Sequence, residues 1–128
     1  MDKTMKITGK GKVSVKPDII RLNMTMEESY KEYDLTLRQS SETIKILKEL
    51  FVSLGFKNDD LKTRSFDINT KYESYKAKDQ SWKKRLIGYT YTHHMLIEFD
   101  TDNKKLGEIL YALAHSVITL EISIEYTQ

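Results

Sequence analysis

Aromatic and basic side chains are interleaved along one stretch in the middle of the sequence. Aromatic rings beside cations hold single-stranded nucleic acid, because bases stack on the rings while the cations neutralise phosphates. The same ring types also pair across neighbouring strands and are enriched in protein interfaces. Three interpretations therefore stay open: core or cross-strand packing, a subunit interface, and a nucleic-acid surface. The aromatic members are Tyr72, Tyr75, Trp82, Tyr89 and Tyr91, and the basic members are Lys71, Lys76, Lys78, Lys83, Lys84 and Arg85.

The three histidines are the candidates for metal binding. His93 and His94 are adjacent, and neighbouring residues of a strand point to opposite faces, so the two cannot chelate one metal without a bulge. His115 lies further along the chain, and only the fold could bring it beside one of them. We therefore predict no metal site and no cofactor.

Catalytic constellations are not recognisable in the sequence. The absence of cysteine excludes thiolate nucleophiles, disulfides and cysteine metal sites. The carboxylate pairs Glu27-Glu28 and Asp59-Asp60 fall at the boundaries of expected elements, where capping and solvation explain them. Gly9-Lys10-Gly11 lacks the third glycine and the following helix of a dinucleotide-binding loop. We predict that the protein is not an enzyme and has no catalytic residues.

Charge is spread unevenly over a chain whose net charge is only +2. Residues 62–85 hold eight basic and three acidic residues, whereas residues 86–128 hold two basic and six acidic residues. A basic stretch of this kind suits nucleic acid or phosphate. The favoured alternative to such a binding site is a solvent-exposed hairpin, in which the lysines serve only to keep the hairpin soluble.

The chain carries no apolar run of the roughly 20 residues that a membrane-spanning helix needs, so we expect no membrane insertion. No apolar stretch follows the basic residues of the N-terminus, as it would in a signal peptide. As it stands, the sequence favours the cytoplasm. A removed export signal would place the protein in the periplasm or outside the cell.

The periodicity of apolar residues predicts the elements that position these groups. Apolar and polar residues alternate over 20–27, 66–72, 87–99 and 118–126, which indicates strands with one buried face. Helical spacing over 33–54 and 106–114 indicates two amphipathic helices.

The intervening segments complete the expected order of elements. Residues 5–15 read as an extended segment with a bend at Gly9–Gly11, and Lys16-Pro17-Asp18 as a tight turn. The polar residues 74–84 read as a hairpin tip.

The fold class that follows is α+β, with the order β-β-α-β-β-α-β. We expect a single mainly antiparallel sheet with two helices packed on one face, forming one domain over residues 1–128. The last strand, at 118–126, is expected to lie at an edge of the sheet.

Four segments resemble the SIMPL-domain family, a bacterial family of unknown function. They are Gly9–Asp18, Leu61–Phe66, Arg85–Tyr89 and Lys105–Ile109, and they occur in the family's order. The chain corresponds to the N-terminal two-thirds of the usual family length. Members continue past the strand that ends here at Tyr126 into an alanine-rich helix and a further strand. In the family that helix covers sheet surface. The resemblance therefore implies that this chain is a short or truncated member, in which another subunit covers the same sheet surface.

The sequence therefore predicts a non-enzymatic binding or assembly module that acts as a homo-oligomer. The alternative is a nucleic-acid-binding module that uses the basic aromatic hairpin 71–91, although nucleic acid is the less favoured partner. A further protein partner is left open. The expected interface residues are Tyr72, Tyr75, Trp82, Tyr89, Ile122 and Tyr126.

Overall fold

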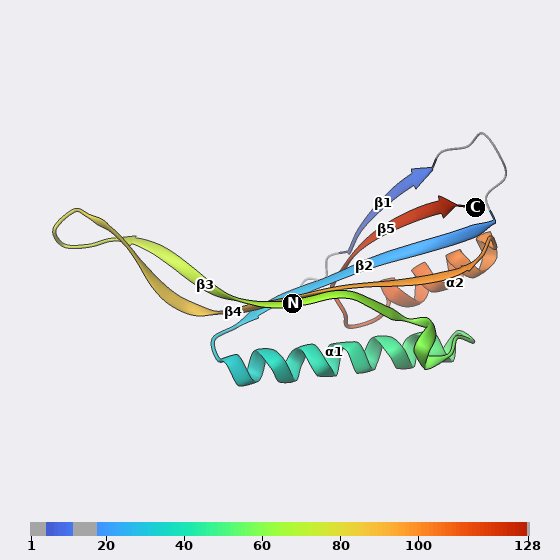
Figure 1. Ribbon diagram of the computed structural model, residues 1–128, viewed down its shortest axis with the longest axis horizontal. Helices are drawn as coiled ribbons and strands as arrows, with labels where there is room; N and C mark the ends of the chain where they lie inside the picture. The colour runs from blue at the N-terminus through green and yellow to red at the C-terminus, as the bar shows by residue number, and fades with distance from the viewer. Residues whose placement is uncertain (1–4, 12–17, 128) are drawn as a thin grey trace.

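The computed structural model describes residues 5–11 and 18–127 (Figure 1). Residues 12–17, which include most of the expected turn at Lys16-Pro17-Asp18, lie outside the described residues. The strands are β1 (Met5–Gly11), β2 (Ile19–Tyr30), β3 (Lys62–Lys76), β4 (Trp82–Asp100) and β5 (Leu120–Thr127). The helices are α1 (Tyr33–Ser53), the short 3-10 helix η1 (Asn58–Asp60) and α2 (Asn103–Ala114).

The described strands form one five-stranded sheet in the order β1-β5-β2-β4-β3. β1 runs parallel to β5, and the other neighbouring pairs are antiparallel. The predicted α+β class is therefore confirmed, but elements differ in detail. β3 and β4 are longer than the alternation predicted, and η1 was not predicted.

The prediction that the last strand lies at an edge is wrong. β5 is hydrogen-bonded to β1 on one side and to β2 on the other, so its backbone groups are paired in both directions. The two edges of the described sheet are β1 and β3.

The core lies between the sheet and the two helices, which cover the same face (Figure 1). Alternate residues of β2 point to this face, and the helices add residues at helical spacing. The fully buried side chains include Ile20, Leu22, Met24 and Met26 of β2, Leu47 and Phe51 of α1, and Ile109 and Leu113 of α2.

Both helices have clear end signals. α1 ends at Ser53, and Gly55 follows it with a φ of 99°; the Gly55 amide donates to the Val52 carbonyl and the Phe56 amide to the Phe51 carbonyl. Asp102 is the N-cap of α2, and its side chain accepts a hydrogen bond from the backbone amide of Lys105 at 3.1 Å.

Candidate functional site

The β3–β4 hairpin extends well beyond the rest of the molecule (Figure 1). Pairing between β2 and β4 ends at Tyr30 and Tyr89, whereas β3 and β4 stay paired as far as Lys76 and Trp82. Residues 71–87, here called the arm, are therefore a two-stranded ribbon with no third strand among the described residues.

A tight turn closes the tip of the arm. Ala77 and Ser81 are joined by a 2.8 Å backbone hydrogen bond, and Gln80 has a φ of 72°. The Asp79 carboxylate accepts hydrogen bonds from the hydroxyl and the backbone amide of Ser81, which lower the pKa of Asp79. The tip is thus ordered by its own residues.

Large apolar side chains of the arm are open to solvent. The exposed fraction is 55% for Tyr72, 72% for Trp82 and 48% for Leu86. Arg85 lies 4.4 Å above the ring of Tyr75, and its guanidinium forms a 3.6 Å ion pair with Glu73. These contacts stay within the arm.

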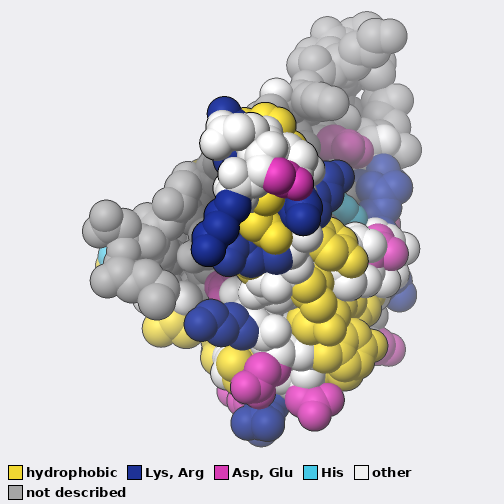
Figure 2. All heavy atoms as spheres, turned by 90° about the vertical axis from the view of Figure 1, so that its left-hand side faces the viewer, with side chains coloured by type: hydrophobic (Ala, Val, Ile, Leu, Met, Phe, Trp, Pro, Cys, Tyr) yellow, Lys and Arg dark blue, Asp and Glu magenta, His cyan; other side chains and the backbone are white. Residues whose placement is uncertain are grey.

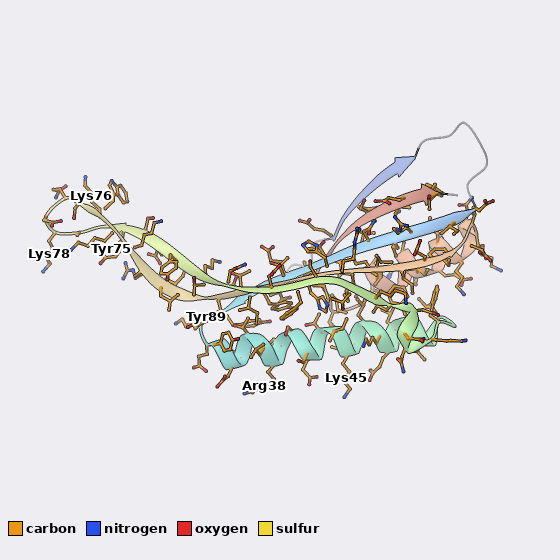
Figure 3. All side chains as sticks on the ribbon, viewed as in Figure 1. Arg38, Lys45, Tyr75, Lys76, Lys78 and Tyr89 are labelled. Atoms are coloured by element: carbon orange, nitrogen blue, oxygen red, sulfur yellow. The ribbon has the colours of Figure 1, made fainter. Side chains whose placement is uncertain are left out.

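Cations surround the apolar side chains of the arm. Lys76 and Lys78 stand at its far end, remote from Arg38 and Lys45 of α1 (Figure 3). Of the charged residues at 71–87, six are basic and two are acidic. The arm therefore combines exposed rings with an excess of positive charge.

Of the predicted interface residues, four lie on the arm or at its base. Tyr72, Tyr75 and Trp82 belong to the arm, and Tyr89 stands where it leaves the body. The ring of Tyr89 makes an edge-on contact with Tyr33 of α1 at 5.4 Å. This contact fixes the base of the arm against α1.

The other two predicted interface residues do not join that surface. Ile122 is only 2% exposed and belongs to the core, so its assignment to an interface is corrected. Tyr126 is half-buried and packs against the same core. The reason is that Ile122 and Tyr126 pair with Met24 and Ile20 of β2, which are buried on the sheet face that the helices cover.

The histidines do not assemble. His93 is buried and its Nε2 lies 2.9 Å from the Thr63 hydroxyl, while His94 is on the opposite face with its Nδ1 2.8 Å from the Thr25 hydroxyl. The predicted opposite orientation is confirmed. His115 is the C-cap of α2, and its Nδ1 lies 2.8 Å from the Tyr111 carbonyl oxygen. Within the described residues, no three His, Asp or Glu side chains group as a metal site would require.

We expect the protein to lose stability as the pH falls below about 6.5, the ordinary pKa of histidine. Burial, together with the nearby charges of His94 and Lys48, lowers the pKa of His93. Between the two pKa values the unfolded chain binds a proton that the folded chain does not, so the free energy of unfolding decreases with falling pH. Urea unfolding between pH 7 and pH 5 measures this slope, which should be shallower in His93→Gln. An identical slope in that variant would contradict the assignment to His93.

Three of the four paired carboxylates, Glu27, Glu28 and Asp60, accept hydrogen bonds from nearby groups. Glu27 accepts a hydrogen bond from Thr92 and Glu28 accepts one from Tyr30, on opposite faces of β2. Asp60 accepts a hydrogen bond from the Lys57 backbone amide at 2.8 Å and so caps η1.

Sequence reasoning missed a polar hollow on the sheet face opposite the helices. Arg21 bridges Glu98 at 3.1 Å and Glu125 at 3.4 Å, and Arg64 donates to Asn23 at 3.2 Å. The sequence did show the polar residues that alternate along each strand. It did not show which strands lie side by side, so these residues could not be grouped into one hollow. The hollow has a volume of about 310 Å³ and is lined by Asn23, Met24, Thr25, Arg64, Ser65, His94, Met95, Ser123 and Glu125.

None of the described helices is both long enough and apolar enough to cross a membrane.

Together, the fold and the site define an α+β domain whose sheet continues into a projecting basic and aromatic arm. The SIMPL family, described as a protein of unknown function (DUF541), matches residues 5–128. The chain belongs to this family. No curated protein matches the chain.

Proposed function

We propose that the protein is a non-enzymatic assembly module that forms a homo-oligomer through its projecting arm. The observation that carries the proposal is the exposure of Tyr72, Trp82 and Leu86 on a ribbon that no third strand of the described residues supports. A two-stranded hairpin is marginally stable by itself in water. Contact with a second copy would bury its rings and keep it in one conformation.

The composition of the arm supports a protein partner. Tyrosine, tryptophan and arginine are enriched at protein interfaces, and the residues that dominate binding energy are drawn from the same three types. The arm carries Tyr72, Tyr75, Trp82 and Arg85 within one short ribbon. An interface that holds two folded copies together buries at least about 1,000 Å² in total.

Shortening the arm should lower the oligomeric state while leaving the body folded. Lys71 and Gly88 are paired, so residues 72–87 can be replaced by Asn-Gly, a two-residue hairpin turn. Light scattering over a dilution series should give at least twice the chain mass for the wild type at high micromolar concentration, and the chain mass for the shortened variant. A wild type that stays monomeric at that concentration would refute the proposal.

A pair of single substitutions separates the arm from general surface hydrophobicity. Trp82→Ala should weaken self-association by at least about tenfold, which is the effect of losing one dominant interface residue. Tyr111→Ala removes a ring of α2 that is 68% exposed, against 72% for Trp82, and should leave self-association unchanged. Equal effects of the two substitutions would mean that the arm has no special role.

The alternative function is nucleic-acid binding, favoured by the excess of cations beside exposed rings on the arm. It differs from assembly in its dependence on salt. Fluorescence anisotropy with a single-stranded oligonucleotide would then show an affinity that falls steeply as salt rises. The Asn-Gly variant would lose that binding. Oligonucleotide binding by a wild type that is monomeric would replace the assembly proposal with this one.

A further inference from the structure

β3 leaves a long free edge. It forms the outer strand of the described sheet over Lys62–Lys76, and no described strand pairs with its outer side. The unpaired N–H and C=O groups of such an edge are a ready template for another strand. Charged residues and bulges usually protect an edge, and here Arg64 and Lys71 flank an inner segment, Ser65–Thr70, whose only charged residue is Asp67.

Apolar side chains accompany this edge. Figure 2 shows a continuous hydrophobic band that runs from the arm, which points at the viewer, down one flank of the molecule. The exposed fraction is 40% for Phe66 and 55% for Tyr72 of β3, and 49% for Tyr33 and 37% for Leu37 of α1. A contiguous exposed patch of this kind marks an interaction surface.

We infer that the segment Ser65–Lys71 of β3 pairs antiparallel with the same segment of a second copy, about a two-fold axis at Ile68. The inference rests on the proposed homo-oligomer and names one of its contacts. The two sheets then continue into each other, and both free β3 edges are satisfied at once.

The geometry of an edge strand restricts the register. Backbone N–H and C=O groups point outward at every second residue of an antiparallel edge strand. Two copies of one strand can therefore pair antiparallel only about an axis that passes through a residue, because outward-pointing residues must face each other. The β3–β4 register shifts at Thr63/Ser65 and again at Lys71/Tyr72, so the regular segment is Ser65–Lys71 and its central residue is Ile68.

The charges agree with this register. Ile68 faces itself and Asp67 faces Asn69 of the second copy. On that face Asp67 has two diagonal neighbours in the second copy, Lys71 and the other Asp67, so two attractive Asp67–Lys71 contacts stand against one pair of carboxylates. An axis at Asp67 would instead place two carboxylates opposite each other.

Single cysteines test the register, because the chain has none of its own. Residues directly opposite in an antiparallel pair have Cα atoms about 4.5–5.5 Å apart, which is within disulfide range. Ile68→Cys should therefore give a disulfide-linked dimer under mild oxidation. Asp67→Cys and Asn69→Cys should each stay monomeric on a denaturing gel, since two identical positions there lie about 8 Å apart. A mixture of the last two variants should form the cross-linked heterodimer.

A charge exchange tests the contact without a covalent bond. Asp67→Lys should raise the dimer dissociation constant by at least about tenfold, because an attraction becomes a repulsion at two symmetric places. Asp67→Lys combined with Lys71→Asp should restore dimerisation. A merely structural role of Asp67 would leave the double variant as weak as the single one.

The outcomes separate this inference from the proposed function. If the wild type is oligomeric but Ile68→Cys does not cross-link and the charge exchange has no effect, the β3 contact is refuted and assembly through the arm stands. If the Asn-Gly variant still cross-links through Ile68→Cys, the β3 contact stands and the role of the arm is refuted. A monomeric wild type refutes both.

Discussion

Phe51→Ala should lower the free energy of unfolding by about 3–5 kcal/mol, the usual loss for truncating a buried phenylalanine. Phe51 is 1% exposed and makes an edge-on contact with Phe56 at 5.6 Å. Phe56 in turn contacts Phe99 of β4 at 5.9 Å and lies under the Lys105 ammonium group. The substitution therefore leaves a cavity at the junction of α1, β4 and α2. These three elements cannot all move inward to fill it.

Urea unfolding followed by circular dichroism measures this loss. The matched control is Val52→Ala, one residue along the same helix, because Val52 is 44% exposed. We expect a change within about 0.5 kcal/mol for that variant. A loss below about 1 kcal/mol for Phe51→Ala would mean that this face of α1 is not packed on the sheet.

Gly88→Ala should be destabilising by about 3 kcal/mol, at the upper end of the effect of overpacking. Gly88 is buried where the arm leaves the body, and a Cβ there would lie 2.4 Å from the Tyr30 carbonyl oxygen and 3.3 Å from the Lys31 Cα atom. Both neighbours are backbone atoms, so no side chain can rotate away. The end of β2 and the base of the arm would have to move apart.

The control substitution, Gly107→Ala, is expected to change stability in the opposite direction. Gly107 lies within α2, and a Cβ there meets nothing within 4 Å. Gly107→Ala should stabilise the protein by about 0.5–1 kcal/mol, because alanine loses less backbone entropy in a helix. Thermal unfolding of both variants measures the difference. If Gly88→Ala were neutral, the close approach of β2 to β4 would be in doubt.

Local periodicity was enough to predict the two long helices and the buried face of β2. The alternation through Ile20, Leu22, Met24 and Met26 predicted the face of β2 that is buried, because a side chain's direction in a strand depends only on its parity. The same rule placed His93 and His94 on opposite faces of β4. The Asp102 cap of α2 and the positive φ of Gly55 after α1 also act within a few residues.

Strand adjacency was not readable. The last strand has the alternation of any half-buried strand, and that pattern is the same at an edge and in the interior. β5 became an inner strand because β1 pairs with it in parallel, a contact between the two ends of the chain. Ile122 was assigned to an interface because its strand was expected at an edge of the sheet, and it proved to lie in the core.

For the candidate surface too, some features follow from the sequence and others only from the tertiary structure. The sequence by itself determined the hairpin, its basic charge and its aromatic residues, because these depend on composition and on neighbouring residues. Only the tertiary structure decided that β2 stops at Tyr30 and leaves the arm unsupported, and that β3 is an outer strand. The physical reason is that hydrogen bonds between strands join residues far apart in the chain, and backbone groups are alike in every residue. The alternation of apolar and polar residues does not specify which strand edge stays unpaired.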